Sequence, residues 1–342
     1  MLDSEIDGMV QDYQQFATSK GDVQKRFIMD KRNVILQITT PPGFDRTLLL
    51  RDAAEALHLP VLNRALLIGS IDVPDIDIAR SLSQYLSDAP PHGHIIGDLP
   101  AVEVVQEVLS AYSDKSGMML HSLVVESGRS QEDGTRDFFR KLAPICFEDP
   151  SLAGDYYDFL DTCKKLDIEP VLISGACSYI YWGRRALKDL DVLVPNLDKL
   201  QALALSRHLN VEHLVSSFAD TQFLNFSHGV EAISDLVVLV KEDNGVRRIP
   251  FTYKDIMSDA RKVRFLGEQC TLMSPEMTVL FKFALGRFGV DQWGQQKDDY
   301  EDARGVFVSQ NINLGSLRRR AEQIGALDRV ILGEKILQLG DK

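Results

Sequence analysis

Short apolar runs that alternate with helical patterns fill the first half of the chain, and this order restricts the possible fold more than any other feature. The apolar runs lie at residues 34–38, 65–69, 94–96 and 119–125, with helical patterns at 49–57 and 102–112. Strands that alternate with helices form βα units, whose strands lie parallel in one sheet. We therefore predict a parallel α/β domain over residues 1–150.

A polar stretch rich in Pro, Gly and Ser at residues 148–154 separates this region from a second patterned region. The second region predicts a helix at 156–166, strands at 171–173, 189–194 and 232–240, and mostly helices after Ser274. Ser274 is a favoured N-cap, and Pro275 suits the first helical position. We predict an α+β domain over residues 151–342 with a C-terminal helical part.

Composition and charge narrow the classes of function. The chain of 342 residues carries a net charge of −12, which argues against indiscriminate nucleic-acid binding. No apolar stretch approaches the roughly 20 residues of a membrane span, and the acidic N-terminus lacks the order of a secretion signal, so we expect a cytoplasmic protein without membrane contact. The four cysteines are far apart, which favours reduced, buried thiols over a zinc site or disulfides.

The loop TTPPGFDRT, residues 39–47, follows a predicted strand and precedes a predicted helix, as a phosphate-binding loop does. Such a loop needs glycines, a lysine and a hydroxyl in the order GxxxxGK[ST]. Here Thr40 replaces the first glycine, Asp45 the second and Arg46 the lysine, whereas Thr47 is kept. Asp45 would place a carboxylate where N–H dipoles should meet a polyanion, so we predict a degenerate phosphate loop.

The stretch VILQITTPPGFDRTLLLRDAAEALHLPVL nevertheless resembles the opening strand, loop and helix of adenylate kinase and related nucleoside monophosphate kinases. The resemblance covers residues 30–148, and residues 94–109 are similar to that family's second nucleotide-binding segment. It implies an adenylate kinase-like P-loop domain without kinase turnover, kept for packing, regulation or partner binding.

The stretch VLISGACSYIYWGRRALKDLDVLVP, residues 171–195, carries the most specific chemical signal in the chain. Residues two apart on a strand point to the same side, so Asp189 and Asp191 present two carboxylates together. Paired carboxylates suit Mg²⁺, which also takes phosphate oxygens. The small-residue turn at 174–176 joins a strand to a helix, whose N-terminus can approach a triphosphate. The stretch therefore predicts a site for a nucleotide and its metal.

The spacing from this turn to the aspartates resembles the nucleotidyltransferase superfamily of the DNA polymerase beta type, over about residues 155–308. The pattern is closest to small bacterial and archaeal members with Gly-Gly and Asp-x-Asp. The resemblance implies a third carboxylate on a neighbouring strand, for which Asp235 is preferred and Glu231 is the alternative. It also implies nucleotide contacts from Ser174, Gly175, Ala176, Ser178, Arg185, Lys282 and Arg287. Asp299 and Asp302 share one helix face and are expected to be structural.

These expectations combine into one reaction. Asp189, Asp191 and Asp235 would be the catalytic carboxylates and the ligands of two Mg²⁺ ions, with an NTP as substrate. An NMP would pass to an acceptor hydroxyl and pyrophosphate would leave. The acceptor stays open between an RNA 3′ end, a protein and a small molecule. The rival hypotheses are a nucleotide-sensing or protein-interaction module with two degenerate sites, and residual nucleoside monophosphate kinase activity in the N-terminal half.

Overall fold

The computed structural model describes most of the chain. The described residues are 3–19, 34–41, 43–59, 61–62, 75–88, 94–97, 103–116, 118–126, 128, 130–147, 149–183, 187–242, 245–290 and 296–338. The strand predicted at 65–69 and the predicted site residue Arg185 lie outside them. The chain forms two compact units. Unit 1 comprises Met1–Ile28, Gly154–Val263 and Cys270–Lys342, and unit 2 comprises Met29–Ala153 and Arg264–Gln269.

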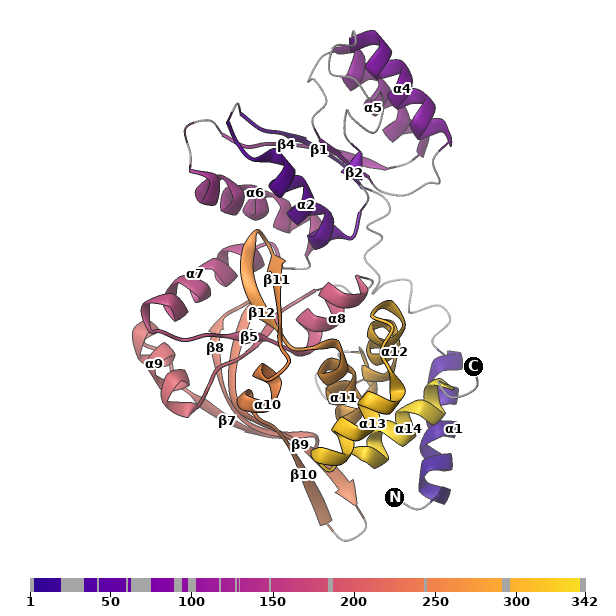
Figure 1. The fold of residues 1–342 in the computed structure, drawn as a ribbon, viewed down its shortest axis with the longest axis vertical. Helices are drawn as coiled ribbons and strands as arrows, with labels where there is room; N and C mark the ends of the chain where they lie inside the picture. The colour runs from indigo at the N-terminus through magenta and orange to yellow at the C-terminus, as the bar shows by residue number, and fades with distance from the viewer. Residues whose placement is uncertain are drawn as a thin grey trace. The chain divides into compact units, whose positions relative to one another are not determined.

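Unit 2 contains a four-stranded sheet whose paired strands are all parallel, as the alternating pattern predicts. The strands in spatial order are β2 (Val61–Leu62), β3 (His94–Gly97), β1 (Val34–Thr39) and β4 (Met119–Val124). The helices are α2 (Arg46–Leu57), α4 (Asp75–Asp88), α5 (Glu103–Ser116) and α6 (Gln131–Cys146). Figure 1 shows α4 and α5 on one side of this sheet and α2 and α6 on the other.

The core of unit 2 follows from its apolar pattern. Ile35 on β1 and Ile96 on β3 are fully buried together with one face of α4 and α5, including Ile78, Leu82 and Leu109. Each fully buried side chain of this size stabilises the fold by about 1.5–3 kcal/mol relative to exposure. The neighbouring residue Leu36 points to the opposite face of β1 and is also fully buried, which explains why this strand is mostly apolar rather than alternating.

Unit 1 is built on a mixed sheet of eight strands, two of which form the β11–β12 hairpin. The spatial order is β11 (Arg261–Phe265), β12 (Glu268–Leu272), β5 (Val171–Leu172), β6 (Leu190–Leu193), β9 (Val230–Glu242), β8 (Ala219–Ser227) and β7 (Glu212–Val215), and β10 (Gly245–Phe251) pairs with β9. β5 runs parallel to β12 and antiparallel to β6, and β6 runs parallel to β9. The α/β class is therefore confirmed for the described residues.

Helices cover this sheet on both faces. They are α1 (Asp3–Ser19), α7 (Leu152–Lys165), α8 (Ser174–Trp182), α9 (Leu197–Arg207), the short α10 (Tyr253–Met257), α11 (Pro275–Leu285), α12 (Asp299–Ser309), α13 (Leu314–Gln323) and α14 (Leu327–Leu337). A small hairpin, β13 (Phe288–Val290) and β14 (Gln296–Asp298), lies between α11 and α12. Figure 1 shows α7 and α9 on one side of the sheet and α8 and α11 to α14 on the other.

The N-terminal helix α1 packs in unit 1, although it precedes the strands of unit 2 in the chain. Tyr13 is buried, and its ring meets Phe288 at 5.5 Å and Tyr300 at 5.2 Å between centroids. The domain predicted for residues 1–150 thus contains a helix that the structure groups with the C-terminal half. No pattern in the sequence signals this grouping, because it depends on aromatic contacts over nearly the whole chain length.

Other predicted elements are found at their expected places. Ser274 caps α11 by accepting a hydrogen bond from the backbone N–H of Met277 at 3.2 Å, and Pro275 lies at the start of the helix. Cys163, Cys177 and Cys270 are buried and form no disulfide, as predicted. Within the described residues, no helix combines the length and the apolar content that crossing a membrane requires.

Candidate active site

The site begins where β6 starts. Asp189 lies exposed just before β6, and Asp191 is half-buried within it. In the parallel register of β6 with β9, Asp191 is paired with Glu231. Side chains at paired positions of neighbouring strands point to the same side of a sheet, and Asp189, two residues before Asp191, points there too. The fold therefore brings Asp189, Asp191 and Glu231 to one side of the sheet.

Electrostatics confirms that these three carboxylates affect one another. Burial, then Asp191 and Asp189, raise the pKa of Glu231 to about 7, and Lys297 opposes this. Burial and the charge of Asp189 also raise the pKa of Asp191. Like charges that share a site resist joint ionisation, and a bound cation would relieve this repulsion.

Asp235, the third carboxylate preferred from the sequence, lies apart from this arrangement. The pairing of β9 with β6 ends at Ile233, and the register of β9 with β8 shifts between the pairs Gln222–Ser234 and Asp220–Val237. Asp235 lies in this irregularity, exposed and with a φ of 52°. The structure therefore favours the alternative, Glu231, because strand register rather than flanking hydrophobicity decides which acid faces Asp191.

The predicted small-residue turn lies beside the carboxylates. β5 is antiparallel to β6, and the backbone N–H of Ile173 donates to the carbonyl oxygen of Asp191 at 3.0 Å. Helix α8 starts at the next residue, and no side chain caps its N-terminus. Its first N–H groups therefore keep their hydrogen-bonding capacity next to Asp191. A helix N-terminus of this kind attracts phosphate.

Ser174 links this turn to the metal-binding candidates. Its side chain hydrogen-bonds to the Asp191 carboxylate, which counteracts the rise in the pKa of Asp191. Its φ of 55° lies in the left-handed region, which glycine adopts at least cost. This is the position at which the resemblance places a glycine. Gly175, Ala176 and Ser178 are buried in the first turns of α8, so the side chains of Ala176 and Ser178 do not face solvent.

Lys282 occupies a different position from the one predicted. Only 1% of its side chain is exposed, and its Nζ contacts Asp299 at 3.0 Å and Asp302 at 2.8 Å. These ion pairs join α11 to α12, which confirms the structural role expected for the two aspartates. A direct contact between Lys282 and a nucleotide would break two buried ion pairs. The charge of Lys282, with Arg287, lowers the pKa of Asp191.

Arg287 lies at the border of this network. Its Nε contacts Asp299 at 2.8 Å, its guanidinium covers the ring of Phe218 at 4.7 Å, and 23% of its side chain is exposed. Lys297 on β14 is half-buried and acts on Glu231 electrostatically. Sequence reasoning missed Lys297, since the only signal for it is the position of β14 in space.

The carboxylates do not form a complete metal cage. No set of three His, Cys, Asp or Glu side chains within the described ranges lies close enough to hold a metal ion. Mg²⁺, however, is commonly bound by one or two carboxylates together with water and substrate phosphates. Asp189 and Asp191 are two carboxylates of this kind, and a bound cation would relieve the mutual repulsion of the acids.

Several N–H groups of the loop at residues 39–47 in unit 2 already donate to protein acceptors. Asp45 is the N-cap of α2, where its carboxylate accepts from the N–H of Leu48 at 3.0 Å. The N–H of Asp45 donates to Gln131 at 2.9 Å, and the N–H groups of Phe44 and Arg46 donate to backbone carbonyls. Three consecutive N–H groups of the loop thus have protein acceptors, and the side chain of Asp45 occupies the helix N-terminus.

Comparisons with known proteins leave the family open. No protein-family model matches the chain, and no curated protein matches it. Among solved structures, the chain is similar to the crystal structure of the lincosamide antibiotic adenylyltransferase LnuA in its lincomycin-bound form. The sequence identity is 12%, the match covers 45% of this chain and 94% of that chain, and the TM-score is 0.28. A score this low supports no inference about function.

Proposed function

We propose that unit 1 is a metal-dependent nucleotidyltransferase that moves an NMP from an NTP to an acceptor hydroxyl and releases pyrophosphate. One observation carries the proposal: Asp189, Asp191 and Glu231 point to one side of the sheet, next to the uncapped N-terminus of α8. Carboxylates for a cation and N–H groups for phosphates are the two requirements of a bound nucleoside triphosphate.

In this proposal, each residue near the site has a separate role. The N-terminus of α8 binds phosphate oxygens through its free N–H groups, and Ser174 orients the Asp191 carboxylate by a hydrogen bond. Glu231, with a pKa of about 7, is suited to accept the proton of the acceptor hydroxyl near neutral pH. Lys297 and Arg287 supply positive charge at the border of the site.

The metal requirement rests on the donor set. Asp189 and Asp191 would hold Mg²⁺ by carboxylate oxygens, with triphosphate oxygens completing the shell. Bound there, the ion would neutralise the triphosphate and lower the pKa of the acceptor hydroxyl. Two ions, as the resemblance implies, would require Glu231 as a further ligand.

Labelled nucleotides test the proposal. We expect the purified protein, with Mg²⁺ and a total cell extract, to transfer label from α-labelled NTP and none from γ-labelled NTP. EDTA should abolish the transfer, and nuclease or protease digestion of the product then identifies the acceptor class. Transfer from γ-labelled NTP alone would instead assign kinase activity, and nucleotide binding without any transfer would assign a sensor.

A further inference from the structure

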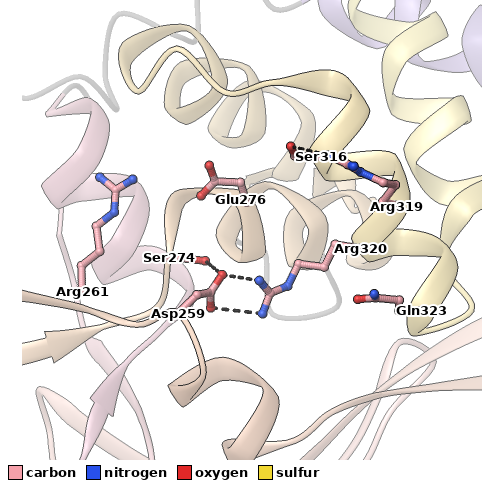
Figure 2. A pocket seen from close by; sticks show the side chains of 8 residues that line it. All are labelled: Asp259, Arg261, Ser274, Glu276, Ser316, Arg319, Arg320 and Gln323. Atoms are coloured by element: carbon pink, nitrogen blue, oxygen red, sulfur yellow. Dashed lines mark hydrogen bonds and ion pairs between the residues drawn. The ribbon is translucent and has the colours of Figure 1, made fainter.

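A pocket of about 600 Å³ lies in unit 1 away from the carboxylates. Its lining residues come from the start of β11 and the segment just before it, from the segment after β12, and from α11 and α13. Asp189, Asp191 and Glu231 are not among them. Figure 2 shows the lining side chains around the opening. Its volume falls within the range of about 300–1,000 Å³ that is typical of small-molecule sites.

One wall of the pocket is held in place by a hydrogen-bonded pair. Arg320 on α13 donates from both terminal nitrogens to the Asp259 carboxylate, which also accepts from the Ser274 hydroxyl at 2.9 Å (Figure 2). The N-cap Ser274 ties this pair to the start of α11. The Arg320 and Asp259 charges cancel, so the pair shapes the pocket without giving it a net charge.

Three other charged side chains in the pocket lack an ionic partner among the described residues. Arg261 reaches only the neutral Gln310 side chain, at 3.5 Å, and its guanidinium lies 5.9 Å from the centre of the Tyr181 ring. Arg319 donates to the Ser316 hydroxyl at 3.3 Å. Glu276, in the first turn of α11, is half-buried. The uncompensated charge of the pocket is therefore positive.

The order of these charges suggests the shape of a ligand. Figure 2 shows Arg261 on one side, Arg319 on the opposite side and Glu276 between them. A molecule that complements this order carries an anionic group at each end and a hydrogen-bond donor between them. Arginine binds phosphate and carboxylate groups through paired N–H donors, and a glutamate carboxylate accepts from a hydroxyl.

We propose that this pocket binds a small molecule with two anionic groups joined by a hydroxyl-bearing carbon chain. Arg261 and Arg319 each bind one anionic group, and Glu276 accepts a hydrogen bond from a hydroxyl of the chain. The anionic groups are phosphates in a sugar bisphosphate or carboxylates in a hydroxy-dicarboxylate. The site is separate from the proposed nucleotide site and does not depend on nucleotidyl transfer.

Isothermal titration calorimetry on the full chain tests this site. The probes are fructose 1,6-bisphosphate and L-malate, with fructose 6-phosphate as the ligand that lacks one anionic group. EDTA in the buffer prevents metal-assisted phosphate binding at the carboxylates. We expect fructose 1,6-bisphosphate or L-malate to bind. If the bisphosphate is the preferred ligand, fructose 6-phosphate should bind at least about tenfold more weakly. Arg261→Gln and Arg319→Gln should each raise the Kd of the preferred probe at least about tenfold.

Two variants distinguish binding in this pocket from binding elsewhere on the protein. Arg304→Gln removes an exposed arginine of α12 outside the pocket and should leave the Kd unchanged. Asp191→Asn should also leave it unchanged, so failure of nucleotidyl transfer would not affect this result. The proposal is overturned if neither probe binds up to about 10 mM, or if either arginine substitution leaves the Kd as in the wild type while circular dichroism shows folded protein.

Discussion

Glu231 and Asp235 show how a difference of four residues on one strand places two carboxylates in different surroundings. Glu231 on β9 is paired with Asp191 on β6. Burial and the charges of Asp191 and Asp189 raise the pKa of Glu231. Asp235 lies beyond the end of this pairing, in the β-bulge. Both acids stand among apolar residues in the sequence, so flanking residues do not distinguish them.

This contrast gives a matched pair of substitutions. Glu231→Gln should lower the rate of label transfer about 100-fold or more, because an amide accepts no proton from the acceptor hydroxyl. Asp235→Asn should leave the rate within about threefold of the wild type, since it changes an exposed residue outside the site. The reverse order of effects, measured with folded variants, would restore Asp235 as the third carboxylate.

Ser174 combines a backbone requirement with a side-chain contact. Its φ of 55° disfavours any side chain, and its hydroxyl bonds to Asp191. Ser174→Gly and Ser174→Ala both remove the hydroxyl, but only glycine adopts this conformation without strain. Urea unfolding should therefore find the glycine variant more stable than the alanine variant by about 1 kcal/mol. Equal stabilities would contradict the left-handed backbone at this position.

At the scale of elements, α8 is positioned by close contact with α12. A Cβ on Gly305 of α12 would lie 2.1 Å from the Trp182 ring at the C-terminal end of α8. The Gln310 side chain also donates to the carbonyl oxygen of Tyr181 at 3.2 Å. These contacts fix the helix whose N-terminus lies beside Asp191.

A side chain added at Gly305 should disturb the proposed active site, although Gly305 does not belong to it. Gly305→Ala is expected to lower the free energy of unfolding by about 1–3 kcal/mol and to lower the transfer rate, because Trp182 must move. Gly8→Ala on α1, where the added Cβ has no atom within 4 Å, serves as the control and should not destabilise the protein. Equal unfolding free energies for the two variants in chemical denaturation would contradict the close packing of α8 on α12.

The ion pairs between α11 and α12 make stability depend on pH. Burial alone would raise the pKa of Asp299, but Arg287 and Lys282 hold it well below its usual range. A carboxylate whose pKa is lower in the folded than in the unfolded protein stabilises the fold above the unfolded pKa, and this contribution is lost as the pH falls further. We therefore expect the Asp299 contribution to decline below about pH 4.

Asp299→Asn tests this dependence. At pH 7 the variant should be less stable by about 3 kcal/mol, because Lys282 and Arg287 lose a buried anionic partner. The difference from the wild type should shrink as the pH is lowered below about 4, since Asp299 then takes up a proton more readily in the unfolded than in the folded protein. Denaturant titrations between about pH 2 and pH 7, a range that includes the ordinary Asp pKa of about 3.9, measure both quantities. A pH-independent difference would contradict the ion-pair assignment.

For the whole molecule, local patterns predicted much of the secondary structure and none of the long-range register. The apolar runs at 34–38, 94–96 and 119–125 became parallel strands. The central strand β1 is buried over residues 35–38, and such burial selects an apolar run. The Asp189–Asp191 pair and the turn at 174–176 were predicted from spacing alone, and the fold brings them together.

The features that sequence did not reveal all depend on distant partners. Lys282 appeared as a nucleotide ligand because its aspartate partners lie on another helix, and only the packing of α11 on α12 brings them together. The placement of α1 in unit 1 depends on Tyr13 and its aromatic neighbours near the other end of the chain. No pattern of short period contains such information.

A crystal structure of the protein with Mn²⁺ and a non-hydrolysable NTP analogue would test the central claim most directly. We predict an anomalous peak for Mn²⁺ about 2.0–2.2 Å from carboxylate oxygens of Asp189 and Asp191, with the triphosphate at the N-terminus of α8. Glu231 should lie beside this ion, and Asp235 should not contact it. A nucleotide bound elsewhere, or a triphosphate at α8 without metal at the two aspartates, would contradict the account.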